Sequence, residues 1–350
     1  MIASLGLTVC AIVLLLMPEV AAHPGFLAPL PRPAPAGGPA FVPHPHGTWS
    51  NVTGVAGIAP PSRVGAASTF DGADGYLVLF GGLTPTGIFL GDSWAFQNSS
   101  WHKLSPKVHP PPRAYASLTY DAIDHYVLLF GGRNRTGSLG DTWEFRSGHW
   151  TALSPATRPP ARNKAAMTYD VGDSYALLFG GNTSGGDLND TWTFAMGAWH
   201  QLNISGPCRR EGAAMAYFAS GGYVILESGW WVPHSSALTA CTSKDTWGYS
   251  RGVWRIVFRG TTTPITPEKR VGPAFAANDT VAVLWGGSNT QVSFRPYLTW
   301  TFFNGTWFYN RGANPPPGPG AFAYKYPVFA WDAAARYFVF YNCGATWTYA

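Results

Sequence analysis

The chain has 350 residues, of which 46% are hydrophobic, 15% are aromatic and only 12% are charged. This composition excludes disorder over most of the length and allows a sizeable aromatic core. The formal net charge of +5 is spread along the sequence, so it gives no support to nucleic-acid binding.

The first 22 residues have the features of a secretory signal peptide. Their apolar run, Leu5 to Met17, is too short for a comfortable membrane span, and the small residues Val20, Ala21 and Ala22 form a cleavage site after it. Because no Lys or Arg precedes the run, the alternative is an uncleaved membrane anchor. We therefore expect a secreted or cell-surface protein, attached to a membrane only if this segment is retained.

Residues 23–46 are rich in proline, which predicts an extended, semi-rigid spacer. Export is also supported by eight N-x-S/T triplets, because such triplets suit a glycosylated extracellular surface. The asparagines of these triplets are Asn51, Asn98, Asn134, Asn182, Asn189, Asn203, Asn278 and Asn304.

One pattern repeats after the spacer. The segments SRVGAASTFDGADGYLVLFGG, PRAYASLTYDAIDHYVLLFGG and ARNKAAMTYDVGDSYALLFGG end in double glycines that are 50 and then 49 residues apart. In each segment an apolar run ends in glycines that tolerate positive φ, which predicts a buried strand followed by a turn. The abundance of glycine (41) and proline (30) also favours short strands and turns over helices.

Self-similarity at about 50 residues, with a double glycine after an apolar strand, resembles the kelch repeat, which forms one blade of a β-propeller. The resemblance covers roughly residues 47–350 and implies an all-β fold. Tryptophans in the expected third strands indicate six blades, and five of them have a partner seven residues later in a fourth strand. The third-strand tryptophans are Trp94, Trp143, Trp192, Trp247, Trp300 and Trp347, and their partners are Trp101, Trp150, Trp199, Trp254 and Trp307.

Trp347 has no such partner, because the sequence given ends three residues later. The segment HGTWSNVT around Trp49 is similar to the fourth strands and precedes the first blade. We therefore predict that an N-terminal strand closes the sixth blade, which removes two unpaired sheet edges from the ring. The predicted organisation is a signal peptide over 1–22, a spacer over 23–46 and a six-bladed kelch-like β-propeller over 47–350.

An arginine precedes the expected innermost strand of five blades. These arginines are Arg63, Arg113, Arg162, Arg210 and Arg270. They could ring one mouth of the central channel and bind carboxylates or sulfates through forked hydrogen bonds. Alternatively, each pairs with an aspartate or with loop carbonyls, and their regular recurrence favours this structural role. The aspartates that begin third strands, such as Asp92, are interpreted as turn-stabilising residues.

Irregular loops of blades 4 and 5 are the strongest candidates for ligand binding. The loop SGWWVPHSSALTACTSK of blade 4 is longer than its counterparts in blades 1–3, and we expect it on the face that also carries the blade connections. Aromatic and arginine side chains on such loops are typical of recognition sites. The candidates are Trp230, Trp231, His234, Arg209, Arg210, Phe294, Arg295 and Tyr297. The alternative is that both tryptophans fold down and plug the channel.

Three cysteines remain after removal of the signal peptide. Cys208 lies in a blade connection and Cys241 in the long blade 4 loop, so the two are candidates for a disulfide bond. Cys343 would then be left over.

The sequence contains no convergent catalytic set and no metal site, so we expect no cofactor. We expect a monomeric, non-enzymatic module that binds a glycan or an extracellular protein. A carbohydrate-active propeller enzyme, such as an oxidase or a sugar-epimerase-like protein, is the alternative, and a structural component of the cell envelope is a third. Galactose oxidase has a kelch-type propeller with a copper site, but its Tyr, His and Cys-linked Tyr ligands match no constellation in this chain.

Overall fold

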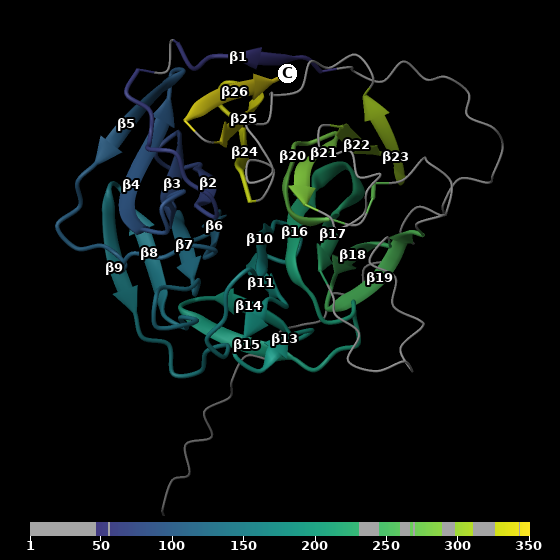
Figure 1. The fold of residues 1–350 in the computed structure, drawn as a ribbon. Helices are drawn as coiled ribbons and strands as arrows, with labels where there is room; N and C mark the ends of the chain where they lie inside the picture. The colour runs from purple at the N-terminus through teal and green to yellow at the C-terminus, as the bar shows by residue number, and fades with distance from the viewer. Residues whose placement is uncertain are drawn as a thin grey trace, which may run out of the picture. The chain divides into compact units, whose positions relative to one another are not determined.

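The structure is a computed structural model that describes residues 47–54, 57–230, 245–259, 267–268, 270–288, 298–310, 326–342 and 344–350. The predicted signal peptide (1–22) and spacer (23–46) lie outside the described residues. Within them the fold is a six-bladed β-propeller, as the repeats predicted. Figure 1 shows its six sheets arranged around a central axis, and each sheet has four antiparallel strands.

Five blades are formed by consecutive strands that run from the centre of the ring to its periphery. Blade 1 contains β2 (Ala67–Asp71), β3 (Tyr76–Leu83), β4 (Phe89–Gln97) and β5 (Ser100–Leu104). Blade 2 contains β6 (Ser117–Asp121), β7 (Tyr126–Phe130), β8 (Thr142–Arg146) and β9 (His149–Leu153). Blade 3 contains β10 (Ala166–Asp170), β11 (Tyr175–Phe179), β14 (Thr191–Ala195) and β15 (Ala198–Leu202), with a small hairpin, β12 (Asn182–Thr183) and β13 (Gly186–Asp187), between its second and third strands.

The remaining blades follow the same plan. Blade 4 contains β16 (Glu211–Phe218), β17 (Tyr223–Trp230), β18 (Thr246–Ser250) and β19 (Val253–Phe258), and the short 3₁₀ helix η1 (Ala219–Gly221) joins its first two strands. Blade 5 contains β20 (Val271–Ala277), β21 (Ala282–Ser288), β22 (Thr299–Phe303) and β23 (Thr306–Asn310). Blade 6 contains β24 (Val328–Asp332), β25 (Tyr337–Asn342), β26 (Ala345–Tyr349) and, as its outermost strand, β1 (Trp49–Asn51).

The second strand of each blade is apolar because neighbouring blades cover both of its faces. In β7 all five residues, YVLLF, are buried. The double glycine after such a strand meets the next blade: a Cβ on Gly81 would lie 2.5 Å from the carbonyl oxygen of Arg113. Gly81 also has a φ of 67°, a value that disfavours other residues. The repeated glycines are therefore required by close packing between blades.

The N-terminal strand β1 lies beside the C-terminal strand β26, as Figure 1 shows by the purple and yellow arrows. The two strands are antiparallel, and Trp49 is opposite Tyr349 in their register. The Trp49 side chain is buried, with its ring 4.9 Å from that of Tyr349 and 5.6 Å from that of Phe340. The segment around Trp49 thus occupies the fourth-strand position of blade 6.

Hydrogen bonds between neighbouring blades repeat around the whole ring. The indole Nε1 of each fourth-strand tryptophan donates to a buried hydroxyl on the third strand of the preceding blade, over 2.8 to 3.0 Å. The donor and acceptor pairs are Trp101 and Thr346, Trp150 and Ser93, Trp199 and Thr142, Trp254 and Thr191, Trp307 and Thr246, and Trp49 and Thr299. Without Trp49 the cycle would be open between blades 5 and 6.

Replacement of Trp49 with alanine should therefore weaken the whole ring. We expect Trp49→Ala to lower the free energy of unfolding by about 3–5 kcal/mol, because it leaves a cavity and removes the bond to Thr299. Equilibrium denaturation in urea measures this loss. Ser50→Ala is the matched control, because Ser50 is an exposed residue of the same strand and should have almost no effect. Equal unfolding midpoints for the two variants would show that β1 does not stabilise the ring.

Candidate functional site

The direction of the strands gives the propeller two distinct faces. One face carries the starts of the first strands, the ends of the second strands and the connections between blades, and we call it the connection face. The turns between first and second strands and between third and fourth strands lie on the other face, which we call the hairpin face. The arginines singled out in the sequence belong to the connection face, and so do the ends of the strands between which the irregular loops of blades 4 and 5 run.

The arginines are buried between strands rather than exposed at a channel mouth. In blade 3, Arg162 donates to both carboxylate oxygens of Asp190 over 2.6 and 2.7 Å, and also to the carbonyl oxygens of Gly180 and Pro160. The Arg162 side chain is completely buried, while that of Asp190 is 18% exposed. Blades 1 and 2 repeat this arrangement through Arg63 with Asp92 and Arg113 with Asp141.

The aspartates of these pairs do more than stabilise a turn, because each also binds other side chains of its blade. Besides the guanidinium, the Asp190 carboxylate accepts a hydrogen bond from the indole Nε1 of Trp192 over 2.7 Å. Burial by itself raises the pKa of Asp190, but the Arg162 hydrogen bonds and charge, with the Trp192 hydrogen bond, bring the pKa below its usual value. The carboxylate therefore stays ionised and fixes the third strand to the first.

Blades 4 and 5 keep the arginine, but the acidic residues around it differ from those of blades 1–3. Arg210 and Arg270 are buried and donate to the carbonyl oxygens of Ser228 and Gly286. Blade 5 has Leu298 where blades 1–4 have an aspartate, and the buried Glu227 of blade 4 contributes negative charge near both arginines. Burial raises the pKa of Glu227 to about 7, against the effects of its Thr246 hydrogen bond and of the two arginines. The five arginines fix strands to one another within their own blades. Because all five are buried, they do not form the ligand-binding ring that was one interpretation of the sequence.

Only three of the predicted loop residues lie in the part of the chain that the structure describes. Trp230 ends β17 and is half-buried, Arg209 is exposed, and Arg210 is buried as described above. The other candidates, Trp231, His234, Phe294, Arg295 and Tyr297, lie outside the described residues, as do Cys241 and Cys343. Of the predicted glycosylation acceptors, Asn51, Asn98, Asn189, Asn203 and Asn304 are exposed, and Asn134, Asn182 and Asn278 are half-buried.

A ring of backbone hydrogen bonds surrounds the central axis on the connection face. It is formed by the residue two positions after each repeated arginine, and by Tyr326 in blade 6. The six residues are Gly65, Tyr115, Lys164, Gly212, Gly272 and Tyr326, and all have φ between 50° and 65°. The amide of Tyr115 donates to the carbonyl oxygen of Gly65 over 2.7 Å, and the amide of Lys164 donates to that of Tyr115 over 2.9 Å. Equivalent bonds join blades 3 and 4, 5 and 6, and 6 and 1.

Three side chains project from this ring and form what we call the central cluster: Tyr115, Lys164 and Tyr326, with the neighbouring Glu211. Lys164 Nζ lies 2.7 Å from a carboxylate oxygen of Glu211. The same ammonium group lies 5.7 and 5.9 Å from the ring centroids of Tyr115 and Tyr326, within the range of cation–π attraction. The two tyrosine rings contact each other edge to face, with centroids 4.9 Å apart.

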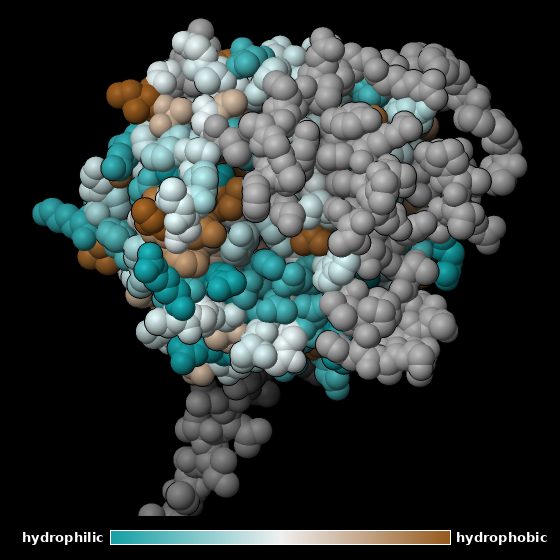
Figure 2. Space-filling model, viewed as in Figure 1, coloured by the Kyte–Doolittle hydropathy of each residue, from teal (hydrophilic) through white to brown (hydrophobic). Residues whose placement is uncertain are grey.

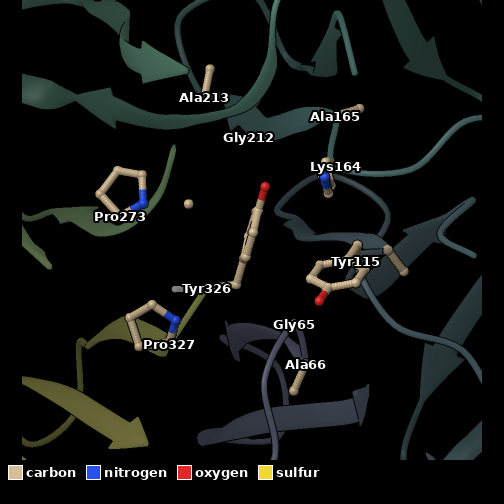
Figure 3. A pocket seen from close by; sticks show the side chains of 12 residues that line it. Gly65, Ala66, Tyr115, Lys164, Ala165, Gly212, Ala213, Pro273, Tyr326 and Pro327 are labelled. Carbon is tan, nitrogen blue, oxygen red and sulfur yellow. The ribbon is translucent and has the colours of Figure 1, made fainter. Parts of the chain in front are cut away.

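Tyr115, Lys164 and Tyr326 of the central cluster line a pocket of about 110 Å³ on the axis, shown in Figure 3. The hydroxyl of Tyr326 is buried there and has no hydrogen-bond partner among the described residues. It approaches Gly212 so closely that a Cβ at that position would lie 2.5 Å from the hydroxyl oxygen. Burial raises the pKa of Tyr326 well above its usual value, so the phenol stays neutral and keeps its proton to donate. The pocket thus combines aromatic surface, an ammonium group and an unused hydroxyl.

The sequence reasoning missed the central cluster because it concentrated on the repeated arginines. The signal was present two residues later, where Gly65, Gly212 and Gly272 alternate with Tyr115 and Lys164 at one repeat position. The backbone ring accepts either a glycine or a large side chain at this position. A large side chain there is therefore not required by the fold, which makes it a candidate for binding.

The described residues contain no group of three or more His, Cys, Asp or Glu side chains that could hold a metal ion. None of their helices is both long and apolar enough to span a bilayer. Figure 2 shows hydrophobic residues in small separate groups among hydrophilic ones over the coloured part of the surface.

Comparison with known proteins gives one family. A family model described as the KLHDC2/KLHL20/DRC7 Kelch-repeats domain matches residues 45–229 and 99–287. The two overlapping matches extend from the N-terminal strand to the second strand of blade 5, which is more than half of the chain. A comparison with curated proteins finds no match.

The arginine–aspartate pairs should be essential to stability. We expect Asp190→Ala to lower the free energy of unfolding at pH 7 by about 3–5 kcal/mol, because it leaves the charge of Arg162 buried and unpaired. Because the pKa of Asp190 is lowered in the folded protein, its contribution is complete above the unfolded pKa of about 3.9 and is lost as the pH falls below that value. Urea denaturation at pH 7 and at pH 3 measures both effects.

Asp279→Ala is the control for removal of a carboxylate, since Asp279 is exposed. An Asp190→Ala variant as stable as Asp279→Ala at pH 7 would contradict the structural role of the pair.

Proposed function

The chain belongs to the kelch-repeat family, and from this membership we propose that it is an extracellular, non-enzymatic module that binds another protein on its connection face. Kelch-repeat propellers typically serve as protein-interaction modules. The observation that carries the proposal is the central cluster, which combines Tyr115, Lys164 and Tyr326 on a rigid backbone ring. Tyrosines are typical anchors of protein interfaces, and a rigid backbone lowers the entropy lost on binding.

The size of the pocket favours a protein partner over a glycan on this face. Pockets that enclose small molecules measure roughly 300–1,000 Å³, whereas this pocket measures about 110 Å³. Such a volume suits one side chain that protrudes from a partner protein. A hydrogen-bonding group on that side chain would reach the unused hydroxyl of Tyr326, and its stem would lie against the ring of Tyr115.

The extracellular location rests on the N-terminal segment and on the glycosylation acceptors. Residues 1–22 combine a short apolar run with small residues at a cleavage position, and five of the eight N-x-S/T asparagines are exposed. An oxidising compartment would also allow the proposed disulfide bond between Cys208 and Cys241, which would tie the long blade 4 loop to the connection between blades 3 and 4.

Glycine replacements test the central cluster without disturbing the ring, because three other blades carry glycine at the equivalent position. Peptides selected from a displayed random library on the purified protein should bind Lys164→Gly and Tyr115→Gly at least tenfold more weakly, a loss of about 1.4 kcal/mol each. Fluorescence anisotropy with the selected peptides measures the affinities.

Lys103→Ala is the control for that experiment, because Lys103 is an exposed lysine on the outer strand of blade 1. Selected peptides that bind the two glycine variants as tightly as the unaltered protein would place the interaction elsewhere and overturn the assignment of the site.

Secretion is tested separately by expression in cultured eukaryotic cells. We expect the protein in the medium to begin at His23 and to lose mass on treatment with peptide N-glycosidase, and Asn203→Gln should remove one glycan because Asn203 is exposed. Retention of residues 1–22 together with an unchanged mass after treatment would contradict the extracellular proposal.

A further inference from the structure

A second and larger cavity opens on the hairpin face, at the opposite end of the axis from the central cluster. It has a volume of about 810 Å³ and is lined by the ends of the first strands and the turns that follow them in all six blades. This volume lies within the range of cavities that enclose small molecules. The connection face therefore offers room for one side chain, and the hairpin face offers room for a whole small ligand.

Half-buried aromatic side chains form part of the cavity wall. Phe70, Tyr217 and Trp331 come from blades 1, 4 and 6 and line the cavity from different sides of the axis. The Trp331 ring is held in place by Phe338, with centroids 4.8 Å apart. The Tyr217 hydroxyl is held close to Gly172 of the neighbouring blade, 3.2 Å from the position of a Cβ there. Neighbouring residues thus hold the rings of Trp331 and Tyr217 against the cavity wall.

Polar groups without partners lie between these rings. The hydroxyls of Ser68, Thr69 and Thr168 line the cavity, are only half-buried, and make no hydrogen bond with the described residues. At the outer end, Arg336 and Asp279 are exposed, and neither forms an ion pair with another described side chain. The cavity thus offers hydroxyls, one guanidinium and one carboxylate, all available to a ligand.

We propose that this cavity is a binding site for a neutral saccharide. A sugar ring has two kinds of surface, C–H faces that pack on aromatic rings and hydroxyl groups that both donate and accept hydrogen bonds. A wholly apolar ligand would bury the three hydroxyls without partners, which costs roughly 1–3 kcal/mol for each group. A strongly charged ligand would gain from one of Arg336 and Asp279 and lose from the other. A neutral polyhydroxylated ligand satisfies every group that lines the cavity.

This inference is independent of the protein-binding function, because the cavity and the central cluster lie on opposite faces and share no lining residue. It also relocates the glycan interaction considered from the sequence, which was assigned to the loops of the connection face.

The test is titration of the full-length secreted protein with glucose, galactose, mannose, N-acetylglucosamine and their β-linked disaccharides, followed by saturation-transfer NMR. N-glycans are first removed, because Asn278 lines the cavity and is one of the eight acceptors. We expect at least one of these sugars to bind with a millimolar or lower Kd. Asp279→Ala should weaken that binding at least fivefold, and Trp331→Ala at least tenfold.

Two variants are used because Trp331→Ala also removes a contact with Phe338, whereas Asp279 is exposed and its loss leaves the fold intact. Lys164→Gly, in the central cluster, should leave sugar binding unchanged. Absence of binding to every sugar, or binding that Asp279→Ala and Trp331→Ala both leave unchanged, would overturn the assignment. Tighter binding of the apolar probe indole than of any sugar would overturn it as well.

Discussion

The hydrogen bond from each outer tryptophan to a hydroxyl of the preceding blade is the interaction on which the ring depends. A single blade is a small twisted sheet with two apolar faces, and it is stable only when neighbours cover both. The buried tryptophan covers one face of its own sheet, while its indole N–H satisfies a buried hydroxyl of the adjacent sheet. Six such bonds complete the circle, and the last depends on Trp49, which precedes the first blade in the chain.

Buried arginines perform a second task, within blades. Each guanidinium binds the carbonyl oxygen of a second-strand end and, in blades 1–3, a third-strand aspartate, so it fixes the loop between those strands against the start of the blade. Blades 4 and 5 depart from the rule together. Leu298 removes the acid of blade 5, and Glu227 adds one in blade 4, so the buried charges near Arg210 and Arg270 remain compensated. A change in one blade is balanced in the next because the two blades share a buried boundary.

The two ends of the axis differ although the same six strands form both. At the connection face, residues with positive φ form a backbone ring around the axis, and the side chains of Tyr115, Lys164 and Tyr326 narrow the pocket inside it. At the hairpin face the first strands diverge into turns, and a wide cavity remains. One rigid scaffold therefore presents two recesses of different size and chemistry. The side chains at equivalent positions of the six blades can vary, because backbone hydrogen bonds form the ring without them.

Local pattern in the sequence was enough to determine the strands, the number of blades and the position of the closing strand. The double glycines, the paired tryptophans and the unmatched Trp49 each reflect a packing requirement that is the same in every blade. Because the requirement recurs, one sequence shows the same pattern several times. The structural role of the arginines was also favoured by this regularity. The aspartate partners were not identified, because Arg162 and Asp190 are 28 residues apart and only the folded blade brings them together.

Tertiary structure alone decided where ligands have room. The residues of the central cluster are far apart in the chain, with 211 positions between Tyr115 and Tyr326, and they meet only because six strands converge on one axis. The saccharide cavity depends in the same way on Phe70, Tyr217 and Trp331, none of which stands out within its own repeat. The repeated residues of the sequence specify the strands and contacts that all blades share. A site on the axis combines one side chain from each of several blades, and no pattern within a single repeat predicts that combination.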